Sequence, residues 1–138
     1  MKFKIVTPEK VVYEDEITQV SLPTTIGEIT VLPHHVPLVS VLLAGELRIV
    51  DKEGEHLLAV AGGFVEVRSN NEVIVLTDNA ERAAEIDIVR AEAARQRAEE
   101  QMQTAKNRED IDYAKLQAVL DREFNRVRIG KKYRKLPS

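Results

Sequence analysis

The 138-residue sequence contains no cysteine and no tryptophan, and aromatic residues make up only 4% of it. The absence of cysteine excludes disulfide scaffolds, cysteine-ligated zinc, iron–sulfur clusters and thiol catalysis. Apolar runs are only a few residues long, far short of the roughly 20 residues that cross a bilayer. The N-terminus also lacks the apolar stretch of a signal peptide. We therefore expect a protein of the cytosol, or one on the cytosolic side of a larger structure.

The composition is that of a folded protein, with 43% apolar and 31% charged residues. Its charges are unevenly distributed. Residues 1–84 carry 7 basic and 13 acidic side chains, whereas residues 85–138 carry 13 basic and 10 acidic ones. This asymmetry predicts two parts with different surroundings, divided between residues 84 and 85.

The first part has the pattern of short β-strands. Val, Ile and Leu recur with partial period-2 alternation, and short polar turns separate the runs. Regular spacing of this kind indicates an antiparallel sandwich or barrel. The expected strands are Lys2–Val6, Val11–Tyr13, Ile17–Leu22, Glu28–Leu32, Glu46–Val50, His56–Val60, Phe64–Arg68 and Glu72–Leu76.

The second part has the pattern of helices, with neither Gly nor Pro between Ile86 and Ile129. Asp87 and Asp110 are candidate N-caps, and residues 106–110 form a polar turn. We expect an antiparallel two-helix hairpin. Either it is an ordinary Ala-rich coiled coil, or its small stripe packs weakly enough to make it mobile. Its two apolar stripes are Ala91, Ala94, Ala98, Met102 and Ala105 on one helix and Tyr113, Leu116, Leu120, Phe124 and Val127 on the other.

Few residues suggest chemistry of their own. His34 and His35 are adjacent, so on a strand they would point to opposite faces and could not chelate one metal. Each is either a structural histidine of the turn or a surface histidine at a protein contact. Gly62-Gly63-Phe64 lies between strands, which indicates a close backbone approach rather than a phosphate loop. The basic end Arg126–Lys135 is either solvated or binds nucleic acid or anionic lipid, although it offers little for base stacking.

Three stretches of sequence carry a resemblance when they are taken together. Residues 21–38 are SLPTTIGEITVLPHHVPL, residues 60–67 are VAGGFVEV, and Ala80-Glu81 precedes Glu85-Ile86-Asp87. In this order and spacing, the chain closely resembles the epsilon subunit of F-type ATP synthases over essentially its whole length. The resemblance implies a ten-stranded antiparallel β-sandwich over residues 1–84 and an antiparallel helical hairpin over residues 85–138.

The resemblance also implies a function. Epsilon subunits are non-catalytic parts of the rotor, which couples the flow of protons or sodium ions to ATP synthesis. The expected partners are the gamma subunit and the c-subunit ring, with Glu28 and His35 near the ring. In the inhibitory state, the helices would reach the alpha and beta subunits and block ATP hydrolysis. The chain would then be a peripheral subunit at the cytoplasmic face of the cell membrane, and no nucleic-acid partner or metal is implied.

A nucleotide site is the sharpest implication of the resemblance. Ile86-Asp87-Ile88-Val89-Arg90-Ala91 matches the "I/L-D-x-x-R-A" motif of ATP-binding bacterial epsilon subunits. ATP would be a regulatory ligand rather than a required cofactor. Alternatively, the arginines pair with Glu92, Glu99 or Glu123 at the surface. The residues that align with those lining ATP are Glu81, Ile86, Asp87, Arg90, Ala91, Arg97, Arg122 and Arg126.

Two other classes of function compete with this interpretation. One is a free-standing ATP-binding sensor or adaptor, which would use the same arginines without a rotary complex. The other is an enzyme built on a cupin-like or other sandwich. The sequence offers no Ser/His/Asp, Cys/His or chelating set at a supporting spacing, which disfavours an enzyme.

Overall fold

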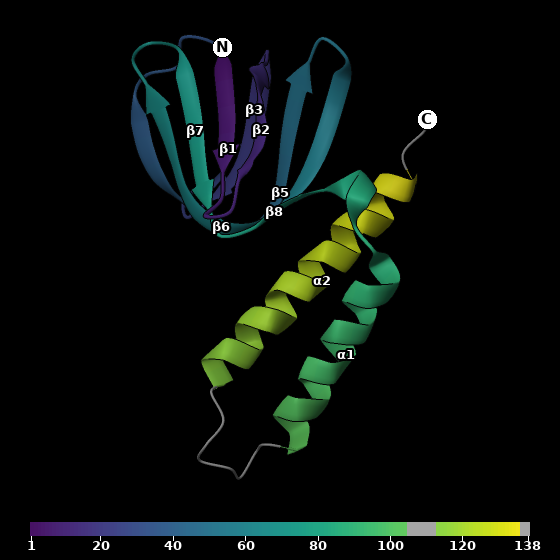
Figure 1. Cartoon of the computed structure of the whole chain (residues 1–138). Helices are drawn as coiled ribbons and strands as arrows, with labels where there is room; N and C mark the ends of the chain where they lie inside the picture. The colour runs from purple at the N-terminus through teal and green to yellow at the C-terminus, as the bar shows by residue number, and fades with distance from the viewer. Residues whose placement is uncertain (105–112, 136–138) are drawn as a thin grey trace. The chain divides into compact units, whose positions relative to one another are not determined.

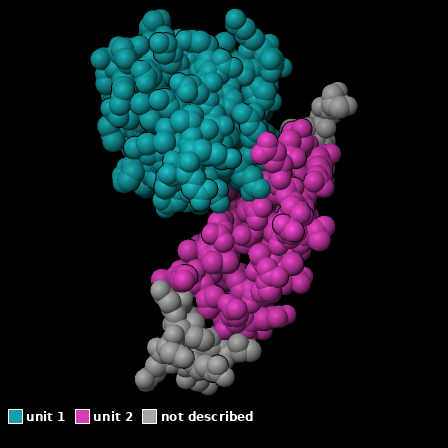
Figure 2. All heavy atoms as spheres, viewed as in Figure 1, with its two compact units in different colours: residues 1–83 teal, residues 84–138 magenta. Residues whose placement is uncertain are grey.

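The computed structural model describes residues 1–104 and 113–135. The chain divides into two compact units, unit 1 from Met1 to Ala83 and unit 2 from Ala84 to Ser138, which are coloured separately in Figure 2. Unit 1 is built of strands. The described part of unit 2 is built of two α-helices and a short 3-10 helix, Ala83–Glu85, at the boundary.

Unit 1 forms one mixed sheet that folds over its own core (Figure 1). Its order is β2-β1-β7-β6-β5-β3-β4, and β8 pairs with β6 outside this path. All neighbouring pairs are antiparallel except β1 and β7, which run parallel from Lys2 beside Glu72 to Val6 beside Leu76. The described residues hold eight strands: β1 (Lys2–Val6), β2 (Val11–Glu16), β3 (Gln19–Thr24), β4 (Gly27–Val31), β5 (Leu38–Asp51), β6 (Gly54–Arg68), β7 (Glu72–Thr77) and β8 (Ala80–Arg82).

The prediction of ten antiparallel strands is therefore wrong in its count and in one pairing. The sandwich itself is correct, but β5 and β6 are each continuous over 14 and 15 residues. The two strands expected at His56–Val60 and Phe64–Arg68 are one, because Gly62 and Gly63 adopt positive φ angles without ending the strand. The parallel pair arises because β1 inserts between β2 and β7.

The core of unit 1 is aliphatic, as expected from a sequence with so few aromatic residues. Phe3 and Ile5 alternate with exposed or half-buried neighbours along β1, and Leu47 and Ile49 do the same along β5. These four side chains are at most 1% exposed. Period-2 alternation thus places one face of each strand in the core, which gives unit 1 its own source of stability.

A polar cluster closes one end of the unit 1 sheet. The buried carboxylate of Asp51 accepts hydrogen bonds from the Tyr13 hydroxyl at 3.0 Å and from the Glu53 backbone N–H at 2.8 Å. The His56 Nε2 atom lies 3.0 Å from the same carboxylate. Burial alone would raise the pKa of Asp51, but the hydrogen bonds from the Glu53 backbone and the Tyr13 hydroxyl, together with the nearby His56 ring, outweigh it, so that the pKa is lowered.

We expect Asp51→Asn to lower the stability of the protein by about 1.5–3 kcal/mol near neutral pH, since it removes hydrogen bonds to a charged group. Because the folded-state pKa lies below the unfolded one, this contribution is present above the unfolded pKa and is lost as pH falls. Urea denaturation between pH 7 and 3 should show the two proteins converging below about pH 4. Asp15→Asn, at an exposed position, is the control. A constant difference at every pH would contradict this account.

Unit 2 contains α1 (Ile88–Thr104) and α2 (Tyr113–Lys135). Asp87 is the N-cap of α1, as predicted, because its Oδ1 accepts the Arg90 backbone N–H at 3.1 Å. The predicted cap at Asp110, the polar turn and Ala105 lie outside the described residues. The predicted antiparallel hairpin depends on that turn and stays a prediction.

Contacts join the start of α1 to the end of α2. Lys131 Nζ lies 3.8 Å from Glu92 Oε2, and Arg134 Nη2 donates to the Ile86 carbonyl at 3.4 Å. At Gly130, an added Cβ would lie 2.9 Å from Ile88 Cγ1, so the missing side chain permits close packing. The basic end Arg126–Lys135 thus lies wholly within α2. One of its side chains, Arg134, is bonded to Ile86 instead of being free in solvent.

The stripe prediction for α2 is partly wrong. Val127 is buried at 8% exposure, but Phe124 is 59% exposed and Glu123 is only 4% exposed. Successive residues of a helix are about 100° apart around its axis. Burial of Glu123 in place of Phe124 therefore means that the buried face is rotated from the predicted stripe toward Glu123. On α1, by contrast, Ala91 and Ala98 are buried as predicted.

Candidate functional site

A row of apolar side chains crosses the outer face of unit 1. Val41 on β5 lies opposite Phe64 on β6, and Phe64 lies opposite Leu76 on β7. Leu76 in turn lies beside Val6 on β1. Val41, Phe64 and Leu76 are 43%, 56% and 50% exposed, respectively. We call Val6, Val41, Phe64 and Leu76 the apolar row.

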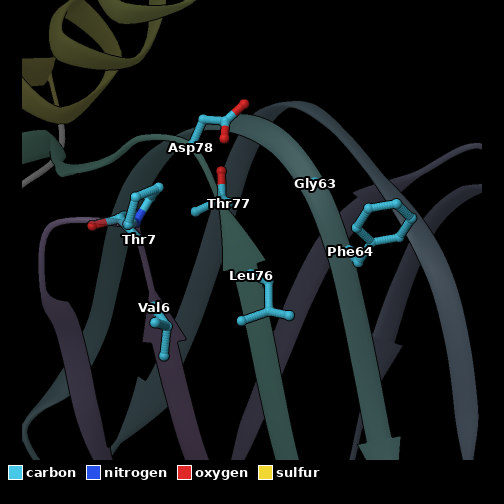
Figure 3. A pocket seen from close by; sticks show the side chains of 8 residues that line it. Val6, Thr7, Gly63, Phe64, Leu76, Thr77 and Asp78 are labelled. Atoms are coloured by element: carbon cyan, nitrogen blue, oxygen red, sulfur yellow. The ribbon is translucent and has the colours of Figure 1, made fainter.

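The apolar row belongs to a wider apolar surface. Val39 and Leu43 flank Val41 at period 2 on β5 and are also exposed, so they share its face. An open groove of about 370 Å³ runs along the row, lined in part by Val6, Phe64 and Leu76, whose side chains lie on adjacent strands in Figure 3. Contiguous exposed apolar surface of this kind marks interaction sites in soluble proteins.

Gly63 shapes this surface. An added Cβ at Gly63, where φ is +143°, would lie 2.0 Å from the Leu76 carbonyl oxygen. At Gly62 the nearest atom to an added Cβ would be the Leu42 carbonyl oxygen, at 3.2 Å. The predicted close backbone approach at Gly62-Gly63 is therefore confirmed, and it holds the β6 and β7 backbones together beside Phe64.

Of the two residues predicted to lie at the c ring, both on unit 1, Glu28 is exposed and His35 is half-buried. Glu28, on β4, pairs with Arg48 at 3.5 Å. His35 lies in a turn in which its backbone N–H donates to the Leu32 carbonyl at 3.1 Å, and its Nδ1 atom lies 2.8 Å from the Val36 carbonyl. Within the described part of the chain, no group of His, Asp and Glu residues could hold a metal ion. Glu28 is thus accessible at the surface, and His35 is accessible only in part.

The arginines predicted to bind ATP have carboxylate partners of their own, with one exception. On α1, Arg90 Nε lies 3.7 Å from Asp87 Oδ2, and its side chain is 88% exposed. On α2, Arg122 and Arg126 both pair with Glu123. Of the three carboxylates named in the alternative interpretation, only Glu123 pairs with any of these arginines in the described structure, and it is buried and not at the surface. Arg97 is exposed and makes no hydrogen bond or ion pair with another described residue.

The other residues of the predicted ATP site lie in two units. Ile86 and Ala91 are buried in unit 2, at 1% and 0% exposure. Glu81 belongs to unit 1, where it lies on β8 opposite Ala59. Within unit 2, the described structure brings Arg122 and Arg126 together around Glu123, and Arg90 together with Asp87.

An ion-pair network on α1 centres on Arg95, which is not among the predicted site residues. Arg95 bonds to Glu92 and, at 2.8 Å, to Glu99. The hydrogen bond from Arg95 lowers the pKa of Glu92, and the same bond raises the pKa of Arg95. The i,i+3 and i,i+4 spacing of the three residues would have revealed this network. It leaves Arg95 engaged within its own helix.

Comparison with known proteins identifies the family. Residues 1–83 match the ATP synthase, Delta/Epsilon chain, beta-sandwich domain. Residues 84–131 match the ATP synthase, Delta/Epsilon chain, long alpha-helix domain. The chain belongs to the ATP synthase delta/epsilon chain family. Its membership confirms the prediction of a non-catalytic subunit rather than an enzyme.

Curated ATP synthase epsilon chains are similar to this member over nearly their full length. The protein of Desulforamulus reducens is 42% identical over 92% of this chain and 94% of its own. That of Dehalococcoides mccartyi strain BAV1 is 44% identical over 99% of this chain and 96% of its own. Both are named ATP synthase epsilon chain, so the epsilon resemblance is confirmed.

Solved structures support the same fold. A chain of the Euglena gracilis mitochondrial ATP synthase, in an OSCP/F1/c-ring structure, matches with a TM-score of 0.74 at 19% identity, over 89% of this chain and 76% of that one. A chain of the Tetrahymena thermophila mitochondrial ATP synthase, in a central stalk and c-ring structure, matches with a TM-score of 0.58 at 19% identity, over 96% of this chain and 95% of that one. Neither described helix of the epsilon-family chain is long and apolar enough to cross a membrane.

Proposed function

We propose that this epsilon-family chain is a rotor subunit of the central stalk in a proton- or sodium-translocating F-type ATP synthase. It takes no part in the chemistry of ATP synthesis and helps to couple that synthesis to ion flow. The observation that carries the proposal is the exposed apolar row, Val6, Val41, Phe64 and Leu76, on a family member with its own folded sandwich. A surface of this kind marks a site of contact with a partner.

The gamma subunit is the partner that we assign to the apolar row. Glu28 and His35 would contact the c-subunit ring, where the exposed carboxylate could meet a basic or polar loop. As a rim charge, Glu28 would influence the fit more than the affinity. The protein would then be held at the cytoplasmic face of the cell membrane only indirectly, through its partner subunits.

Purification from native membranes tests this assignment. A tagged full-length chain should co-purify with the gamma, alpha and beta subunits and the c ring after mild detergent extraction. A free-standing ATP sensor, the competing function, has no need for the exposed apolar row. Recovery of the chain as a free protein under the same conditions would favour that alternative.

The helical unit is the proposed regulator. With α1 and α2 packed as an antiparallel hairpin, unit 2 would be folded back in a non-inhibiting state. When extended, its basic helices would approach acidic surfaces of the alpha and beta subunits and block ATP hydrolysis. The charge difference between residues 1–84 and 85–138 supports this division of labour.

ATP would favour the folded-back state. Arginines of α1 and α2 can meet around one phosphate chain only when the two helices are adjacent. A ligand shifts a conformational equilibrium only through such a difference in affinity. The proposed ATP-binding residues are Glu81, Ile86, Asp87, Arg90, Ala91, Arg97, Arg122 and Arg126.

Arg126→Ala should weaken ATP binding about tenfold to a hundredfold, because it removes charge-assisted hydrogen bonds of about 1.5–3 kcal/mol. Isothermal titration calorimetry of the full chain measures this loss. Arg128→Ala is the matched control, since Arg128 bonds to Asn125 and is outside the proposed site. Equal ATP affinity for the Arg126 and Arg128 variants would show that Arg126 belongs to a solvated face.

A further inference from the structure

A buried carboxylate occupies the position between the two α2 arginines of the proposed ATP site. Glu123 is 4% exposed, although carboxylates are seldom buried to this extent. Its Oε1 atom lies 3.2 Å from Arg122 Nε, and its Oε2 atom lies 2.7 Å from Arg126 Nη1. Each carboxylate oxygen thus has a guanidinium of its own.

The burial of Glu123 has a physical requirement. A carboxylate withdrawn from water is strongly unfavourable unless it is paired and hydrogen-bonded. Both recorded ion pairs come from the same turns of α2, so they do not depend on where α1 or unit 1 lies. Glu123 shares a helix face with Val127 and Gly130, since positions four and seven residues apart lie above one another. An apolar residue would therefore suit this position for packing alone.

Arginine–carboxylate and arginine–phosphate pairs use the same donors in the same geometry. A guanidinium edge that bonds Glu123 is not available to a phosphate oxygen at the same time. The polyphosphate of a nucleotide must therefore displace Glu123 from Arg122 and Arg126, or share them at a cost in charge repulsion.

We infer that Glu123 is an internal competitor for the polyphosphate of ATP, held by Arg122 and Arg126 when no nucleotide is bound. This inference rests on the proposed ATP site and adds its regulation. Competition lowers the affinity for ATP and so raises the concentration at which the sensor responds.

The test is Glu123→Gln in the full chain, since glutamine keeps the shape and removes the charge. Calorimetric titration with ATP and with inorganic tripolyphosphate should show both ligands binding about tenfold more tightly to the variant, which corresponds to one lost charge-assisted interaction. The matched control is Glu99→Gln, which removes a carboxylate that pairs with Arg95 on α1 instead. The control should leave both affinities unchanged.

The outcomes separate this inference from the proposed function. If ATP binds the wild type and Glu123→Gln equally, ATP sensing stands and the competitor role is wrong. If tripolyphosphate binds Glu123→Gln more tightly than the wild type, but ATP binds no more tightly than tripolyphosphate, the competition stands and nucleotide sensing is wrong. If neither ligand binds either protein at millimolar concentration, both are wrong.

Nuclear magnetic resonance on the wild type gives an answer even if Glu123→Gln does not fold. With the glutamate carboxyl carbons and arginine Nε atoms labelled, millimolar tripolyphosphate should shift the Glu123 carboxyl signal and the Arg122 and Arg126 signals together. Arginine signals that shift while the Glu123 carboxyl signal stays in place would overturn the inference. So would the absence of any shift.

Discussion

A chain carrying Phe64→Asp should fold normally and yet fail to bind the ATP synthase stalk. Phe64 is 56% exposed, so its replacement removes little from the core of unit 1. It lies in the middle of the apolar row, between Val41 and Leu76. A carboxylate buried there without a partner would oppose binding, and we expect a loss of affinity for the gamma subunit of about a hundredfold or more.

The matched control for Phe64→Asp is Phe124→Asp. Phe124 is 59% exposed, but it lies on α2, in the unit proposed to regulate rather than to attach. Binding of purified gamma subunit to each variant, measured beside thermal denaturation, separates attachment from folding. The assignment of the apolar row fails if Phe64→Asp binds as tightly as Phe124→Asp, or if both variants lose binding equally.

Gly63→Ala should destabilise unit 1 by at least about 3 kcal/mol, since it combines backbone strain with a steric clash. The added Cβ would lie 2.0 Å from the Leu76 carbonyl oxygen, a backbone atom that cannot move without disrupting the pairing of β6 and β7. The positive φ of +143° adds strain for any residue with a side chain. Urea denaturation followed by far-ultraviolet circular dichroism measures the loss.

Gly54→Ala provides the comparison for Gly63→Ala. Gly54 also has a positive φ, +122°, but no atom lies within 4 Å of an added Cβ. Strain without a clash should cost only about 1–2 kcal/mol. Similar losses for the two variants would show that conformational strain, and not the contact with β7, makes glycine necessary at position 63.

Local rules predicted the elements of this fold well. The alternation around Phe3 and Ile5 and around Leu47 and Ile49 depends only on neighbouring residues, and it placed the strands and their buried faces correctly. The N-cap at Asp87 is equally local, because a side chain bonds to a backbone group three residues away.

Features that depend on distant residues could not be predicted in this way. The parallel pairing of Lys2 with Glu72 joins strands 70 residues apart, and no short pattern specifies it. At Gly62 and Gly63, carbonyl oxygens of neighbouring strands lie close to the place that a side chain would take, and no local pattern reveals these contacts. The count of ten strands failed because it relied on resemblance rather than on these contacts.

The arginines show where residue type misleads. A helical wheel assigns Phe124 to the interior and Glu123 to solvent, yet the structure does the reverse. Glu123 can be buried because Arg122 and Arg126 neutralise it, a pairing that a stripe of apolar residues does not reveal. The sequence indicates Glu123 as a carboxylate partner of these arginines, but no pattern in it predicts the burial of Glu123.

The central proposal is that unit 1 attaches the chain to the rotor and unit 2 regulates it. The most direct measurement compares ATP synthesis and ATP hydrolysis in vesicles whose ATP synthase contains the full chain, residues 1–84 alone, or no epsilon chain. We predict that residues 1–84 restore synthesis and that the complex hydrolyses ATP faster than one with the full chain. Failure of residues 1–84 to restore synthesis above the level without an epsilon chain, or hydrolysis equal to that with the full chain, would contradict the account.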